Sequence, residues 1–153
     1  MTNDPLDELY RETILEHARH PRNFGLLPQA DAEGEGKNPI CGDEVAIQLA
    51  LEDGRIGAVR FRGRGCSISQ ASASMLTEAV QGQSLTQVSV LIDGVEHLLR
   101  GETAPRDELG DLESLQGVAQ FPMRVKCALL AWKVLRQALD RPDQTPASAR
   151  PPT

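Results

Sequence analysis

The sequence lacks the features on which membrane, secreted and nucleic-acid-binding proteins depend. No apolar run in its 153 residues approaches the ~20 residues that span a bilayer. The first residues, MTNDPLDELY, carry acidic side chains where a signal peptide would carry a basic region and an apolar core. The net charge is −6, and no cluster of Lys and Arg with interleaved aromatics is present. We therefore expect a cytoplasmic location, no membrane association and no nucleic acid partner.

Cysteine is also scarce, since the chain has only Cys41, Cys66 and Cys127. Three cysteines cannot all pair within one chain, and a reducing cytosol disfavours disulfides. The thiols are therefore buried packing residues, metal ligands or reactive groups. The three histidines, His17, His20 and His97, lie in helical patterns or at helix ends, where we expect surface positions rather than ligands.

What is present is the composition of one globular domain, 40% hydrophobic and 25% charged. Apolar side chains recur at helical spacing in four segments and alternate in two, and Asp53-Gly54 is typical of a tight hairpin turn between the two. The pattern predicts an α+β fold, a small antiparallel β-sheet with helices packed on it. The expected helices cover residues 5–20, 67–81, 85–98 and 121–139, and the expected strands cover residues 44–51 and 56–62.

The remaining segments are polar or interrupted by proline and glycine. Residues 29–38 fit either an exposed connection or a weak edge strand, and residues 101–111 an exposed loop. The tail from Asp140 is rich in Pro, Ala and Ser. We expect residues 1–139 to form one domain and residues 140–153 to be a disordered tail.

The cysteines occupy similar places in this predicted fold. Cys41 precedes the first clear strand in a glycine-containing turn, Cys66 precedes a helix, and Cys127 lies early in the last helix. Such positions can converge at one end of the sheet. For Cys127 alone, packing is as good an explanation as ligation, because free cysteine is often buried. For Cys41 and Cys66 packing explains less, although the spacing of the three matches no short zinc-finger signature.

Asp43 could complete a metal site. An aspartate near a turn often bonds the local backbone, but in an extended segment Asp43 and Cys41 would share one face. Three thiolates and one carboxylate suit tetrahedral zinc. Their four negative charges exceed the two positive charges of the zinc ion. The cationic side chains nearby in sequence could either offset this excess or simply be solvated at the surface. Those side chains are Arg62, Arg64, Arg124 and Lys126.

These segments carry a family resemblance. NPICGDEV, FRGRGCSISQASASMLTEAVQG and FPMRVKCALLAWKVL resemble the three cysteine segments of the U-type iron–sulfur cluster assembly proteins, the family of IscU and the NifU N-terminal domain. The segment LDELYRETILEHARHPRNFG resembles the family's N-terminus, so the likeness covers residues 5–139. Lys126 stands where IscU-like scaffolds carry a histidine, and residues 85–120 form a longer segment. Both departures match the SUF-system branch, SufU.

The resemblance implies a SufE/NifU-like fold and a zinc-dependent, sulfurtransferase-like sulfur acceptor rather than a free-standing enzyme. It implies a SUF-type cysteine desulfurase as partner and a downstream SUF scaffold complex as a candidate recipient. By position, Cys41, Asp43, Cys66 and Cys127 would bind Zn²⁺, and Cys41 would accept the sulfur. Gly42 would let the turn release Cys41. The alternative is a scaffold that binds iron or a [2Fe–2S] cluster. A purely structural zinc site is disfavoured, because such sites usually close with four Cys or His ligands.

Overall fold

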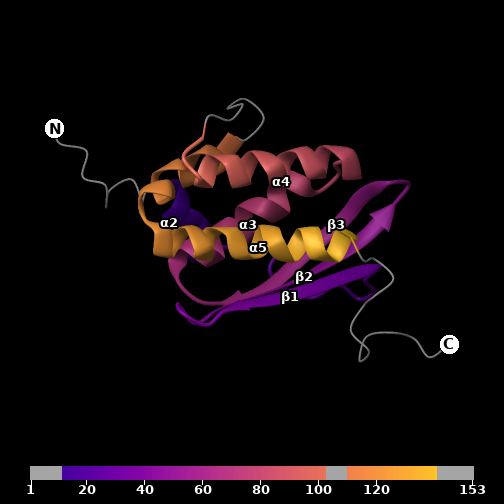
Figure 1. Cartoon of the computed structure of the whole chain (residues 1–153). Coiled ribbons are helices and arrows are strands. Elements are labelled where there is room, and N and C mark those ends of the chain that lie inside the picture. Colours follow the sequence, from indigo (N-terminus) through magenta and orange to yellow (C-terminus); the bar gives the residue numbers. More distant parts are fainter. Residues whose placement is uncertain (1–11, 103–109, 141–153) are drawn as a thin grey trace.

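A three-stranded antiparallel sheet lies beneath two layers of helices in the computed structural model, which describes residues 12–102 and 110–140 (Figure 1). The sheet is covered on one face by α3 and α5, and α4 lies on the far side of these two helices. The α+β prediction for a single domain is confirmed. The elements in chain order are α2 (Glu12–Arg19), β1 (Ala32–Asn38), β2 (Asp43–Glu52), β3 (Arg55–Arg64), α3 (Ser67–Val80), α4 (Leu85–Leu99), the 3₁₀ helix η1 (Gly110–Gln120) and α5 (Pro122–Asp140).

The expected segments that fall outside the described residues are 5–11 of the first helix, 103–109 of the loop, and the tail beyond Asp140. No helix in the described parts of the chain is long and apolar enough to cross a membrane.

The sheet is built from two hairpins. Asp53 and Gly54 have φ angles of 52° and 75°, so the turn between β2 and β3 has the left-handed backbone that the sequence predicted. β1 pairs with β2 from Ala32 opposite Leu49 to Asn38 opposite Asp43. The edge-strand interpretation is therefore correct for residues 32–38, whereas residues 29–31 form a connection that precedes the strand.

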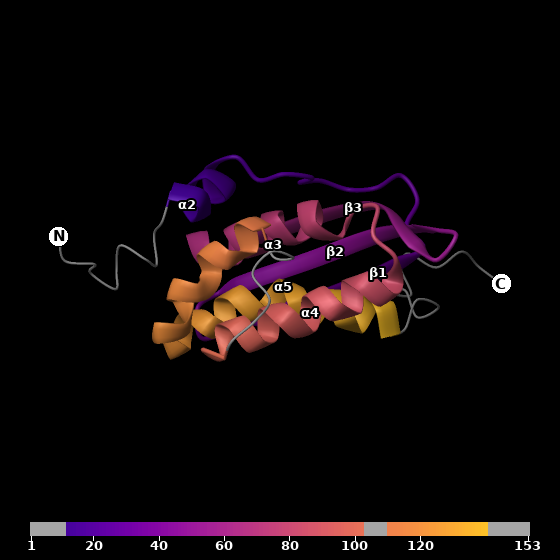
Figure 2. The same ribbon diagram turned by 90° about the horizontal axis from the view of Figure 1, so that it is seen from above.

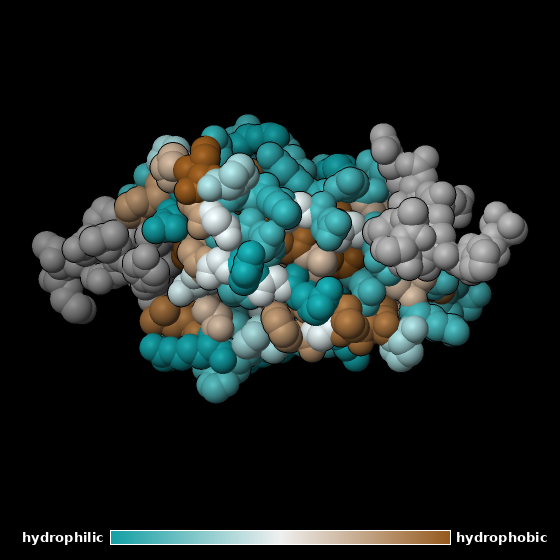
Figure 3. All heavy atoms as spheres, turned by 90° about the horizontal axis from the view of Figure 1, so that it is seen from below, coloured by the Kyte–Doolittle hydropathy of each residue, from teal (hydrophilic) through white to brown (hydrophobic). Residues whose placement is uncertain are grey.

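Only one face of the sheet is apolar. The buried positions alternate along β2. In β3 the same alternation is interrupted once, where its pairing with β2 shifts register opposite Ala50 and Leu51. The opposite face carries charged side chains, and hydrophilic residues cover much of the surface seen from below, with apolar residues in small separate patches (Figure 3). The helices consequently pack on one side only. The buried residues of β2 and β3 are Asp43, Val45, Ile47, Leu49, Ile56, Val59 and Phe61, and those of β1 are Ala32 and Asn38.

Two glycines bring α5 close to the edge strand. A Cβ atom on Gly34 would lie 2.9 Å from the carbonyl oxygen of Val134, and one on Gly36 would lie 2.9 Å from a methyl group of the same valine. No larger side chain fits, so the backbones approach directly. The next inward position of β1 is Asn38, and the close approach places it within reach of Cys127 on α5.

The helix ends follow their sequence signals. The Ser84 hydroxyl accepts the Gln87 N–H at 3.2 Å and begins α4, and Pro122 occupies the first position of α5. α3 ends at Val80, and Gly82 follows with φ +82°. η1 was not predicted. Its buried Leu112, Leu115 and Val118 pack against α4 and α5 and add the last part of the core.

Candidate metal centre

Three of the four predicted ligands meet at one end of the sheet. The ligand atoms of Cys41, Asp43 and Cys127 all lie within 4.8 Å of one another. Cys41 comes from the loop between β1 and β2, Asp43 begins β2, and Cys127 lies in α5. Cys66, directly before α3, adjoins this set, because its backbone N–H donates to Asp43 Oδ1 at 3.0 Å. The three cysteine segments therefore converge as predicted.

Asp43 is held by hydrogen bonds from three segments of the chain. It is only 1% exposed, and its Oδ1 also accepts from the Ser69 hydroxyl at 3.2 Å, while Oδ2 accepts from Asn38 Nδ2 at 3.4 Å. Burial raises the pKa of the carboxyl, but hydrogen bonds from the Cys127 thiol, the Cys66 backbone and Ser69 together lower it below its ordinary value. Asp43 is therefore a fixed, ionised carboxylate facing the thiols.

Cys127 is fully buried on the inner side of the centre. Its Sγ lies 3.7 Å from Asn38 Nδ2 and 3.7 Å from the carbonyl oxygen of Met123. Burial raises the pKa of the Cys127 thiol, and its contacts with Asp43, Cys41 and Cys66 raise it further. Without a cation, this thiol keeps its proton at neutral pH. A metal ion would have to displace that proton to bind.

Cys41 differs from Cys127 in its support and its access. Its side chain is half-buried and lies on the hairpin loop, next to the exposed Ile40. The loop is closed by the N–H groups of Cys41 and Gly42, which donate to the carbonyl oxygen of Asn38 at 3.2 and 2.8 Å. Gly42 has φ +74°, a conformation that other residues adopt with strain. Cys41 therefore lies on a turn, whereas Cys127 lies inside a packed helix.

Sequence reasoning missed the residues that support Asp43. Gly65 has φ +148°, and a Cβ there would lie 2.2 Å from Asp43 Oδ1 and 2.8 Å from Ser69 Oγ, so only glycine fits. Asn38 faces Asp43 across the hairpin, which the edge-strand interpretation could have shown. Ser69 lies one turn into α3 from Cys66, a spacing that places its hydroxyl at the same helix end.

Two of the cationic side chains that could have softened the negative charge at the predicted site, Arg64 and Lys126, lie on the surface. Arg64 is 82% exposed and pairs with Glu44, and Lys126 is exposed. None of the cationic side chains in the described ranges is among the groups that shift the pKa of Asp43 or Cys127. The solvated interpretation is therefore correct for Arg64 and Lys126.

The donor set fits zinc. Tetrahedral zinc with sulfur and oxygen ligands requires separations between ligands of about 3.4 to 3.8 Å, which the three ligand atoms can reach within their 4.8 Å limit. The carboxylate and the Cys127 thiol are also fixed by hydrogen bonds from Asn38 and Ser69, as is usual around metal ligands.

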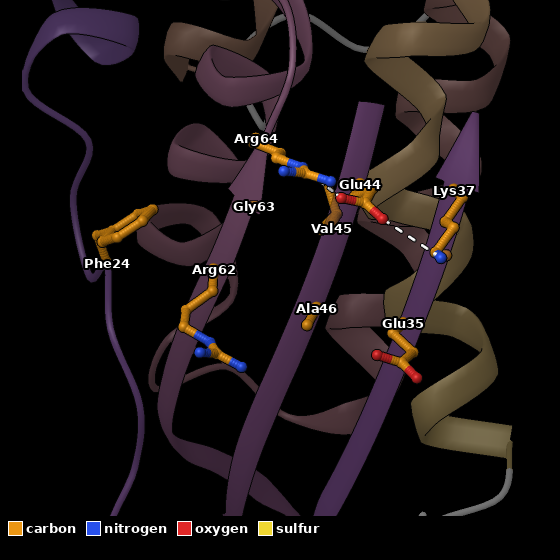
Figure 4. Close-up of a pocket in the computed structure, with 10 residues that line it drawn as sticks. Phe24, Glu35, Lys37, Glu44, Val45, Ala46, Arg62, Gly63 and Arg64 are labelled. Atoms are coloured by element: carbon orange, nitrogen blue, oxygen red, sulfur yellow. Dashed lines mark hydrogen bonds and ion pairs between the residues drawn. The ribbon is translucent and has the colours of Figure 1, made fainter. Parts of the chain in front are cut away.

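A groove of about 640 Å³ lies elsewhere, on the outer face of the sheet (Figure 4). Ala46 forms part of its floor, and Arg62 and Glu35 stand on opposite sides of it. Lys37 and Arg64 both pair with Glu44 at the end nearest the thiols. No thiol lines this groove, so it is separate from the candidate metal centre.

The prediction that His17 lies on a helix surface is wrong. His17 is 2% exposed, because α2 packs it against α3, and its Nδ1 lies 2.8 Å from the Ser74 hydroxyl. Only residues 12–19 of that helix are described, and the sequence pattern gave no sign of the contact, since Ser74 is distant along the chain. His20 and His97 are exposed, as predicted.

The chain is similar to iron–sulfur assembly proteins. The family model of the NifU-like N-terminal domain matches residues 9–141. The zinc-dependent sulfurtransferase SufU of Bacillus subtilis is 39% identical over 138 residues, which cover 90% of this chain and 93% of that protein. The iron–sulfur cluster assembly scaffold protein IscU of Streptococcus pyogenes is 37% identical, over 92% of this chain and 89% of its own.

A solved structure has the same fold. The crystal structure of a SUF-system cluster assembly scaffold protein from Fervidobacterium islandicum AW-1 superposes with a TM-score of 0.83 and is 34% identical, covering 87% of this chain and 98% of that one. Because the family model matches most of the chain and the relatives align nearly end to end, the chain belongs to the NifU-like N-terminal domain family.

Proposed function

We propose that the chain is a zinc-dependent sulfur acceptor and carrier in iron–sulfur cluster assembly. The observation that carries this proposal is the placement of Cys41. Its thiol is within 4.8 Å of the ligand atoms of Asp43 and Cys127, yet it comes from a hairpin loop and is half-buried rather than enclosed. Asp43 also departs from the four Cys or His ligands with which purely structural zinc sites usually close.

Cys41, Asp43, Cys66 and Cys127 would hold the ion. Bound zinc would keep the thiols as thiolates at neutral pH. Asn38 and Ser69 orient the carboxylate, and Asn38 also faces the Cys127 sulfur. Cys127 and Cys66 are tied to helices α5 and α3, so Cys41 is the ligand that can leave with the least rearrangement of the fold.

The transfer step is a thiol–persulfide exchange. The Cys41 thiolate attacks the terminal sulfur of a cysteine persulfide on the partner. A new S–S bond forms on Cys41, the partner's S–S bond breaks, and the partner's inner sulfur leaves as a thiolate. Cys41 then carries the persulfide, and no net oxidation or reduction occurs. The half-buried position of Cys41 allows a partner side chain to reach it.

The relatives support the choice of partner. The Bacillus subtilis relative is a zinc-dependent sulfurtransferase, and the Fervidobacterium structure is assigned to the SUF system. We infer a SUF-type cysteine desulfurase as the sulfur donor, a cytoplasmic location, and a downstream SUF scaffold complex as the recipient. The assembly domain would comprise residues 1–139, with residues 140–153 as a tail outside it.

A second candidate function is a scaffold for a [2Fe–2S] cluster, because relatives of similar identity are named IscU scaffold proteins. The residue before Cys127 weighs against it. Lys126 is exposed, and a charged ammonium cannot ligate iron, so this chain lacks an imidazole at that position.

Metal analysis of the protein as purified distinguishes the two functions. The sulfur acceptor should be colourless and contain about one zinc per chain, because its donor set suits tetrahedral zinc. A brown protein that contains iron and acid-labile sulfide, and that accepts no sulfur from the desulfurase, would favour the scaffold.

A further inference from the structure

A second cluster of potential ligands lies where α2, α3 and η1 meet. His17 Nε2 is 3.3 Å from Asp111 Oδ2 and 3.6 Å from Glu78 Oε1, and the three ligand atoms lie within 4.8 Å of one another. Each residue comes from a different element, and Figure 2 shows α2 beside α3 when the molecule is seen from above. None of these residues belongs to the thiol centre. We propose that His17, Glu78 and Asp111 form a second divalent-metal site, with nitrogen and oxygen ligands.

The imidazole is fixed in the orientation that a ligand needs. Its Nδ1 lies 2.8 Å from Ser74 Oγ, and that hydroxyl in turn accepts the Arg22 N–H at 2.8 Å. The ring is almost fully buried, so it cannot turn away. Metal-binding histidines are commonly held in this way through the nitrogen that does not bind the ion. The free nitrogen, Nε2, is directed toward both carboxylates.

The distances match those around a bound first-row cation. Metal bonds of about 2.0 to 2.2 Å to nitrogen and oxygen place neighbouring ligands about 3.0 to 3.5 Å apart. The two measured separations, 3.3 and 3.6 Å, therefore need little adjustment. Glu78 and Asp111 are 48% and 66% exposed, so an ion can enter from solvent and water can complete its coordination.

The charge of the cluster also favours a cation. Carboxylates only accept hydrogen bonds, and both lie near the same nitrogen, His17 Nε2, at 3.3 and 3.6 Å. Within the described ranges, neither carboxylate pairs with any side chain other than His17. One divalent cation would balance the two negative charges and contact all three ligands. The same ion would fasten η1 and α2 to α3.

This site has nitrogen and oxygen donors but no sulfur. It should therefore prefer different metal ions from those that the thiol centre prefers. Thiolates select zinc and softer ions, whereas Mn²⁺ favours carboxylate oxygen ligands, of which this site has two. Zinc binds such sites more tightly than Mn²⁺ and would replace it. The class of ligand is therefore a first-row divalent ion, and Mn²⁺ is the probe that reports this site alone.

The test uses the full chain, with the thiol centre first filled by one equivalent of zinc. Mn²⁺ is titrated in, and its electron paramagnetic resonance signal measures the free ion. Wild type should take up about one Mn²⁺ per chain, and a second equivalent of zinc should release it. Glu78→Gln and Asp111→Asn should each weaken uptake by about tenfold or more, because each removes one ligand from a partly exposed side chain.

His97→Gln is the matched control. His97 Nδ1 lies 2.7 Å from Glu102 on the surface, a histidine–carboxylate pair outside the cluster, so this variant should bind Mn²⁺ like wild type. His17→Gln should abolish Mn²⁺ uptake. If that buried substitution unfolds the chain, Mn²⁺ uptake by the two carboxylate variants tests the proposal instead. No saturable uptake by wild type, or equal uptake by wild type, Glu78→Gln and Asp111→Asn, would overturn the proposal and leave the cluster an ion pair.

Discussion

Asn38 and Asp43 face each other across the hairpin that carries Cys41, and the Asn38 amide donates to Asp43 Oδ2 at 3.4 Å. The pair closes the loop at its base, and the same amide lies 3.7 Å from Cys127 Sγ. One side chain therefore connects the edge strand, the carboxylate and the buried thiol.

Removing this amide should weaken metal retention. In Asn38→Ala, Asp43 and Cys127 lose a donor that orients them, and we expect zinc to dissociate about 10 to 100 times faster, as for other residues that support metal ligands. Asn38→Asp should be at least as defective, since it adds negative charge. Competition with a chromogenic chelator measures the rate. Gln48→Ala, on the outer face of β2, is the control, and a wild-type rate in Asn38→Ala would contradict the account.

Gly65→Ala should disrupt the centre through a steric clash with Asp43. The added methyl group would lie 2.2 Å from Asp43 Oδ1, so the carboxylate or the backbone must shift. We expect the free energy of unfolding to fall by about 2–3 kcal/mol, and zinc content to fall with it. Gly42→Ala is the comparison, because its Cβ meets nothing within 4 Å and only the backbone is strained.

Gly42→Ala should cost about 1–2 kcal/mol and keep its zinc. Chemical denaturation and metal analysis of both variants provide the measurement. Equal zinc content in Gly65→Ala and wild type would show that the contact with Asp43 is dispensable.

Cys66→Ser should lower zinc affinity, because it removes a thiolate while keeping the backbone N–H that donates to Asp43. Ser67→Ala, one residue further along, should bind zinc normally. Metal content after dialysis against a chelator compares the two. Zinc binding by Cys66→Ser equal to that of wild type would remove Cys66 from the ligand set and leave Cys41, Asp43 and Cys127.

Stability of the metal-free protein should fall at alkaline pH. The pKa of the Cys127 thiol is raised in the folded state, so between its unfolded value of about 8.5 and its folded value the native state binds more protons than the unfolded state. The contribution of the thiol to the free energy of unfolding is complete below the pKa of the unfolded state. It is lost progressively as the pH rises from that pKa through the pKa of the folded state.

Thermal unfolding from about pH 7 to about pH 10 should therefore show a falling melting temperature, which Cys127→Ala flattens. The zinc-bound protein should not show this trend, because its Cys127 is already deprotonated. If the melting temperature fell equally with pH in wild type and Cys127→Ala, groups other than Cys127 would be responsible for the fall.

Local signals in the sequence were enough to predict the hairpin at Asp53-Gly54, the cap at Ser84 and the helical start at Pro122, because each depends on neighbouring residues. The cysteine segments were recognised from their residues and from their resemblance to a family. The roles of Asn38, Gly65 and Ser69 and the burial of His17 depend on contacts between distant segments. η1 has a short 3₁₀ repeat with weak periodicity, so its burial became clear only from its packing on α4 and α5.

The central claim is that Cys41 accepts the sulfur. Cys41→Ala should keep its fold and part of its metal, since three ligands remain and water can fill the fourth position. Asp43→Ala keeps all three thiols, and with less negative charge around the ion Cys41 should be retained more tightly and accept sulfur slowly.

The direct measurement is the mass of the intact chain after incubation with a SUF-type cysteine desulfurase and cysteine. Wild type should gain sulfur that a reductant removes, Asp43→Ala should gain it slowly, and Cys41→Ala should gain none. A Cys41→Ala protein that gains one sulfur atom at the wild-type rate would contradict the account and make Cys127 the next candidate.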